Sequence, residues 1–140
     1  MTNSKKLTTW TIALSFFIIV GLGHGIGCIG LIELAWLTNF NTEDFSISLT
    51  SSYNTSLKAV AFFAIIGHLL LIISLFVKAQ EKNYWIKITG TIFLWISIYY
   101  LTHNLFTDFA SQIGFFSAIP FLICSGILFY SIVKQRIQRT

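Results

Sequence analysis

Four long apolar stretches fill most of this chain, at about residues 11–37, 57–77, 84–102 and 110–133. Each is close to the length of about 20 apolar residues that an α-helix needs to cross a bilayer. Because the backbone of such a segment must satisfy its own hydrogen bonds in lipid, each stretch predicts a helix. The sequence therefore predicts a single all-α domain, a bundle of four antiparallel transmembrane helices at about 9–37, 57–78, 84–104 and 110–134.

The composition supports the same class of protein. Hydrophobic residues make up 55% of the 140 residues and charged residues only 10%, and the mean hydropathy is +0.77. Soluble domains carry about a quarter of their residues as charged side chains. This composition excludes an ordinary soluble domain, and the polar joint at 38–56 is too short to bury a second core. The lipid bilayer is the first partner that the sequence predicts.

The charged residues fall into two groups along the chain. Eight of the nine Lys and Arg residues lie near the two termini or between the second and third helices: Lys5, Lys6, Lys78, Lys82, Lys87, Lys134, Arg136 and Arg139. The other joints hold Glu43, Asp44 and Asp108, with Lys58 as their cation. Because cationic loops stay in the cytoplasm, we expect an inner (plasma) membrane protein with both termini cytoplasmic. Cations at helix ends do not indicate nucleic-acid binding.

The first apolar stretch is rich in glycine. Its five glycines are Gly21, Gly23, Gly25, Gly27 and Gly30. Small residues four apart let two membrane helices approach closely, so this spacing predicts a helix-packing face. That face can lie within the bundle, against another membrane protein, or against a second copy of the chain. A phosphate-binding loop is not indicated, because no strand precedes the glycines.

Two histidines lie near the middle of predicted helices. His24 and His68 both have small neighbours and fall at matching depths, so their rings can meet if the two helices face each other. Three interpretations stay open: the axial ligands of a haem b, a pocket for a quinone, proton or lipid substrate, or structural hydrogen bonds between helices. No metal site is predicted, because ligands beyond nearby Cys28 cannot be placed.

A second polar cluster is predicted near the outer face. It consists of Glu33, Lys58, His103 and Asp108, which fall at one depth at the ends of the predicted spans. A pair between Glu33 and Lys58 or His103 would lower the cost of a carboxylate near the membrane. In a helix Glu33 lies about half a turn around from His24, so the two share no pocket unless the helix bends. We expect a structural role for this cluster.

The end of the third predicted helix carries a family resemblance. It reads Tyr100-Leu101-Thr102-His103 and is followed by Asp108 in a short loop. With the chain length and the four spans, this region resembles the DoxX-like families, which are small bacterial four-helix membrane proteins. Many of them have no assigned activity, and some are linked to thiol or quinone redox systems. The resemblance covers mainly residues 57–133, so it implies the architecture but no functional residue.

No arrangement typical of a catalytic site is visible in the sequence. A Ser-His-Asp set, a nucleotide loop and paired catalytic carboxylates are all missing, so no catalytic residue is predicted. The function that the sequence favours is a non-enzymatic, partner-binding or accessory subunit of a membrane complex. The alternatives are a redox-linked protein that binds haem b or quinone through His24 and His68, and a small oligomeric transporter or channel.

Overall fold

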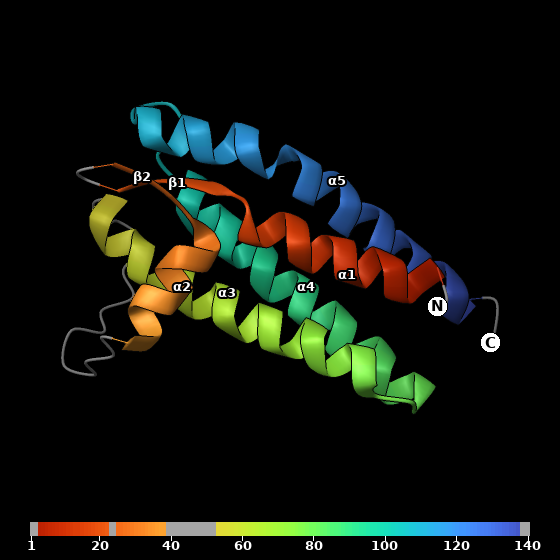
Figure 1. The fold of residues 1–140 in the computed structure, drawn as a ribbon. Coiled ribbons are helices and arrows are strands. Elements are labelled where there is room, and N and C mark those ends of the chain that lie inside the picture. The colour runs from red at the N-terminus through yellow and green to blue at the C-terminus, as the bar shows by residue number, and fades with distance from the viewer. Residues whose placement is uncertain (1–2, 23–24, 39–52, 138–140) are drawn as a thin grey trace.

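The fold is a bundle of helices whose first segment is interrupted by a short hairpin. The computed structural model describes residues 3–22, 25–38 and 53–137. In this part of the chain the elements are α1 (Asn3–Phe16), β1 (Ile19–Leu22), β2 (Gly25–Cys28), α2 (Ile29–Thr38), α3 (Tyr53–Phe76), α4 (Gln80–Thr102) and α5 (Phe109–Ile137). The longer helices run along the axis of the molecule, and α2 and the hairpin lie at one end (Figure 1). The protein is thus mostly helical, as predicted.

Three of the predicted helices have close counterparts in the structure. The helix α5 covers the range predicted for the fourth span, and α3 and α4 cover all but the last two residues of the second and third. Among the described residues, two segments are long and apolar enough to cross a membrane, Leu57–Phe76 within α3 and the whole of α5. Within the described residues, α3 and α5 are therefore the two candidate membrane-spanning helices.

The helix pair α3 and α4 is packed closely around two glycines. A Cβ atom built on Gly67 would lie 3.0 Å from the backbone oxygen of Gly90, and one on Gly90 would lie 3.1 Å from the oxygen of Gly67. The two backbones can approach this closely only because neither residue has a side chain. Since three residues separate the helices, they are adjacent and antiparallel, as the short joint predicts.

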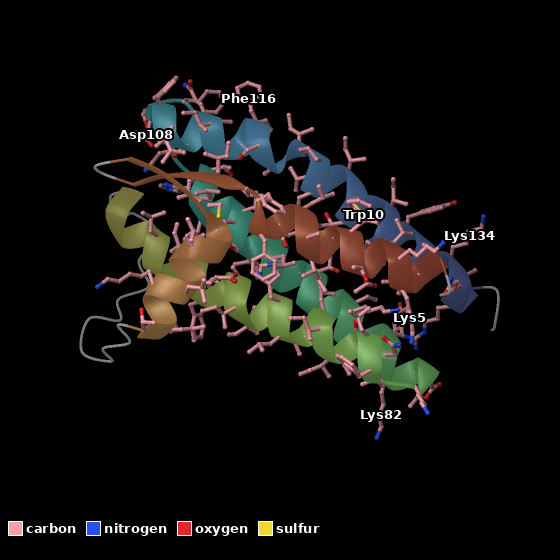
Figure 2. All side chains as sticks on the ribbon, viewed as in Figure 1. Lys5, Trp10, Lys82, Asp108, Phe116 and Lys134 are labelled. Carbon is pink, nitrogen blue, oxygen red and sulfur yellow. The ribbon has the colours of Figure 1, made fainter. Side chains whose placement is uncertain are left out.

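The long helix α5 buries a single face, on which the buried residues are regularly spaced. Its buried residues alternate at intervals of three and four positions, which is one continuous stripe on a helix: Ser111, Gly114, Ala118, Phe121, Ser125, Leu128 and Ile132. Its exposed large apolar residues, among them Phe116, Ile123 and Ile127, lie on other sides. Figure 2 shows Phe116 pointing away from the bundle. The inner stripe packs against α1, β1 and α4.

The prediction of one continuous helix over 9–37 is wrong. The helix α1 ends at Phe16, the antiparallel strands β1 and β2 follow, and α2 begins at Ile29. The β-branched run from Ile18 to Val20 favours an extended backbone, and glycine is a poor helix former. In the hairpin, Gly27 pairs with Val20 and Gly21 pairs with Ile26, so a glycine stands opposite a larger residue in each pair.

The hairpin is tied to the rest of the bundle at its first strand. The backbone N–H of Ile19 donates to the Ser117 hydroxyl of α5 at 2.9 Å, and the N–H of Ile29 donates to the Ile18 oxygen at 3.0 Å. Val20 and Gly27 are buried, while Ile26 is exposed. One face of the hairpin therefore covers the bundle, and α5 supplies a partner for the outer edge of β1.

We predict that Ser117→Ala loosens this attachment. The change leaves the Ile19 N–H without its acceptor, and a lost hydrogen bond costs about 1 kcal/mol. Thermal unfolding of the purified protein in detergent should show a lower midpoint for this variant. Ser117→Thr keeps the hydroxyl and should stay closer to the unchanged protein. Equal midpoints for both variants and the unchanged protein would contradict the anchoring role.

Candidate functional site

Three side chains from three different helices meet in the interior, next to the point where the first segment changes direction. The imidazole of His68 in α3 has its Nε2 atom 2.5 Å from the Ser15 hydroxyl of α1 and its Nδ1 atom 2.6 Å from Glu33 Oε1 of α2. Ser15, His68 and Glu33 are 1%, 3% and 5% exposed. They form one buried, hydrogen-bonded chain, which we call the Ser15–His68–Glu33 relay.

The interruption of the first segment makes this meeting possible. Ser15 and Glu33 are 18 positions apart, so a continuous helix would separate them by about 27 Å along its axis. The hairpin reverses the chain between them, and both side chains then reach the same ring. The relay is therefore a product of the hairpin rather than of any local sequence motif.

An aromatic ring fixes the orientation of the imidazole. Phe16 stacks on His68 with ring centroids 4.2 Å apart and planes inclined by 4°. The same phenyl ring approaches Gly30 of α2 so closely that a Cβ atom there would lie 2.7 Å from Phe16 Cδ1. Gly30 is thus needed for the approach of α2, and Phe16 joins α1 to both α2 and α3. This stacking limits rotation of the His68 ring.

The hydrogen bonds of the relay suit two protonation states of His68. The Ser15 hydroxyl can donate either to His68 Nε2 or to the backbone oxygen of Ile12, which is 2.8 Å away. With a neutral ring, Nδ1–H donates to the Glu33 carboxylate and Nε2 accepts from Ser15. With a protonated ring, both nitrogens donate and the Ser15 proton turns to Ile12. One proton can therefore be added without leaving any of these groups unpaired.

The structure treats the other predicted outer-cluster residues differently. Asp108 lies just before α5, where its Oδ2 atom accepts from the N–H and hydroxyl of Ser111 at 3.1 and 3.2 Å, so it caps that helix. His103 is exposed at the end of α4, and Lys58 is half-buried near the start of α3. Glu33 reaches inward to His68 instead of lying at the rim. Of the predicted residues, the structure brings together Glu33 and His68.

The predicted contact of His24 with His68 lies outside the described residues, as does Gly23. Three of the remaining predicted packing glycines, Gly21, Gly25 and Gly27, are on the strands, so they cannot form a helix-packing face. Gly30 is in α2 and contacts Phe16. The prediction is wrong for these three glycines, because the strands interrupt the helix on which their spacing was projected.

Ser15 is the relay member that sequence reasoning missed. It belongs to a row of hydroxyl residues on α1, at positions 4, 8, 11 and 15, whose intervals of four, three and four follow one helix face. That row was the available signal. Within the described part of the chain, no group of three or more His, Cys, Asp or Glu side chains is arranged to hold a metal ion.

Comparisons with known proteins add no relative from which a function could be transferred. No protein-family model, curated protein or solved structure matches this chain. The resemblance to the DoxX-like families therefore stays a prediction. The function has to be inferred from the chemistry of the relay and from its place in the fold.

Proposed function

We propose that this chain is a multi-pass membrane protein that carries protons across the bilayer through His68. The observation that supports this proposal is the buried Ser15–His68–Glu33 relay, which offers hydrogen-bond partners to both protonation states of the imidazole. Histidine is the side chain whose ordinary pKa lies closest to neutral pH. Chains of Asp, Glu and His inside membrane bundles are typical of proton pathways.

The distribution of apolar and charged residues supports a membrane location. Two segments are long and apolar enough to cross a bilayer, and large apolar side chains are exposed on every described helix. We infer that α4 and the first segment complete four crossings. Lys5, Lys82 and Lys134 lie at one end of the bundle and Asp108 at the other (Figure 2). By the positive-inside rule, the lysine end faces the cytoplasm of the inner membrane.

The interrupted first segment supports transport over a purely structural role. Non-helical backbone at membrane depth is tolerated where protein covers it or where it lines a polar cavity. Transporters commonly place their binding sites beside such discontinuous helices. Here the relay lies between the end of α1, the α2 helix and α3, next to the hairpin. The break and the ionisable pair thus occur together.

The proposal gives a role to each member of the relay. Neutral His68 accepts a proton on Nε2 while the Ser15 hydroxyl turns toward Ile12, which gives an imidazolium paired with the Glu33 carboxylate. Transfer of the Nδ1 proton to Glu33 then leaves a neutral ring in the other tautomer. Release of that proton from Glu33 leaves the ring as the Nε2–H tautomer. Rotation of the ring, which brings its N–H back toward Glu33, then completes one cycle, and the stacked Phe16 ring limits how often this rotation occurs.

The other functions that the sequence suggests have less support. Both ring nitrogens of His68 are engaged in hydrogen bonds, so ligation of haem iron would have to break the contact with Ser15 or Glu33. The accessory-subunit hypothesis relied on a glycine-rich helix face. Because Gly21, Gly25 and Gly27 are on strands, that face has lost its basis.

We predict that proteoliposomes containing the protein conduct protons and that Glu33→Gln abolishes most of this flux. Vesicles would be loaded with a pH-sensitive dye and energised by a potassium gradient with valinomycin. Since Gln cannot accept the Nδ1 proton, we expect the flux to fall by roughly tenfold or more. His68→Gln should act in the same way.

The matched control is His103→Gln, because His103 is an exposed histidine outside the relay. It should keep the flux of the unchanged protein. Flux no greater than in protein-free vesicles, or equal flux in the Glu33→Gln variant, would refute the proposal. Thermal unfolding of each variant before reconstitution separates loss of function from loss of fold.

A further inference from the structure

We propose that the buried hydroxyl face of α1 is the route by which water and protons reach His68 from the lysine-rich end of the bundle. This inference rests on the proposed proton-carrying function and adds the side of entry. The face consists of Ser4, Thr8, Thr11 and Ser15, which follow one another at intervals of four, three and four residues. Such residues form a straight row on a helix. The row ends at the relay, since Ser15 contacts His68.

The helix α1 buries polar side chains and exposes apolar ones, which is the reverse of a helix packed by apolar contacts. Thr8 and Thr11 are fully buried, whereas Trp10 is 63% exposed and Phe17, just beyond the helix, is 76% exposed. Burying hydroxyls in place of apolar side chains brings no hydrophobic gain and requires a hydrogen bond for each. A polar inner face with an apolar outer face is the arrangement found where membrane helices enclose a polar path.

Three hydroxyls of this face, those of Thr8, Thr11 and Ser15, donate within α1. Three also contact other helices: Ser4 meets Lys87 of α4, Thr11 lies 3.5 Å from Cys124 Sγ of α5, and Ser15 meets His68 of α3. Thr8 donates to the Ser4 oxygen at 2.9 Å and Thr11 to the Leu7 oxygen at 2.8 Å. In α4, Thr91 donates to the Lys87 oxygen at 2.8 Å. Such bonds within a helix survive when the helices part, and the hydroxyl oxygens can then accept from water. Loosening α1 from its neighbours therefore exposes these hydroxyl oxygens to water.

At the lysine-rich end of the bundle, Lys87 contacts Ser4, the first residue of the hydroxyl face. The ammonium of Lys87 in α4 donates to the Ser4 hydroxyl of α1 at 2.9 Å, and Lys87 is 6% exposed. It lies one turn below Thr91, so the contact stands at the mouth of the hydroxyl row. Lys5, the next residue along α1, adds a second positive charge at this end (Figure 2). Breaking the Lys87–Ser4 contact opens the hydroxyl face of α1 to water from this end of the bundle.

The test compares two adjacent positions at one depth in the membrane. In a Cys28→Ser/Cys124→Ser protein in lipid vesicles, Thr11→Cys places a thiol on the hydroxyl face and Trp10→Cys places one on the outer face. Because a hydrated thiolate attacks a methanethiosulfonate reagent and displaces methanesulfinate, we expect the Thr11→Cys protein to be modified roughly tenfold faster. Lys134→Cys, at an exposed position on the same end, shows that the cationic reagent reaches this side.

The outcomes separate this inference from the proposed function. Equal modification of the Thr11→Cys and Trp10→Cys proteins, or no modification of Thr11→Cys while Lys134→Cys reacts, overturns the route. If protons still cross the vesicles in that case, His68 is reached from elsewhere and the function stands. Modification of Thr11→Cys without any proton flux supports the water route and removes the function. Lys87→Met should speed the modification, because it removes the contact with Ser4.

Discussion

His68→Leu should lower the free energy of unfolding by about 3 kcal/mol, because it leaves the Glu33 carboxylate buried without its partner. The same change removes the acceptor of Ser15 and the ring on which Phe16 stacks. Equilibrium unfolding of the purified protein in detergent micelles measures the loss. His103→Leu is the matched control, since it deletes an exposed histidine and should change the stability little.

A double-mutant cycle shows whether this loss comes from the buried charge. The variant Glu33→Leu/His68→Leu replaces both partners by apolar groups, and such replacements are often neutral or stabilising. The double variant should therefore be more stable than His68→Leu alone. Additive losses from the two substitutions would mean that Glu33 and His68 are not coupled. That result would contradict the relay as the structure describes it.

Gly67→Leu should be the most disruptive substitution in the α3–α4 pair, and we expect it to lower the free energy of unfolding by about 3 kcal/mol. A Cβ atom at this position would lie 2.7 Å from Leu94 Cγ and 3.0 Å from the backbone oxygen of Gly90. A backbone atom cannot turn aside as a flexible side chain does, so α3 and α4 must move apart. Thermal unfolding, with gel filtration to detect misassembly, measures the effect.

Gly126→Leu in α5 is the control for this prediction. A Cβ atom at Gly126 would meet no heavy atom within 4 Å, so the larger side chain has open space. Its unfolding midpoint should stay close to that of the unchanged protein. If Gly67→Leu and Gly126→Leu behaved alike, close approach of α3 and α4 at Gly67 would not be a source of stability.

Apolar length predicts the helices of this protein well where each stretch forms a single element. The helices α3, α4 and α5 follow this rule because their apolar residues continue without a break in backbone preference. The first stretch is equally apolar but has β-branched residues at 18–20 and glycines at alternate positions from 21 to 27. That spacing of two is the period of a strand, and hydropathy alone does not distinguish it from a helix.

The sequence singled out two residues of the candidate site, but it did not predict that they would contact each other. His68 stands out as a histidine within an apolar helix, and Glu33 as a carboxylate at the end of another apolar stretch. Projection on a continuous helix placed them in separate sites, because it could not include the reversal at the hairpin. For Ser15 the only sequence signal was its place in the hydroxyl row of α1, and its partner, a ring 53 positions later in the chain, could not be read from that row.

The bond between the Ile19 N–H and Ser117 also bears on the order of assembly. These residues are 98 positions apart, so the acceptor for the edge of β1 is synthesised long after the strand itself. Until α5 packs there, that backbone group must keep a water molecule or another temporary partner, because a buried amide without a hydrogen-bond partner is costly. The edge of β1 therefore reaches its final hydrogen bonding only after α5 has been made and has packed against it.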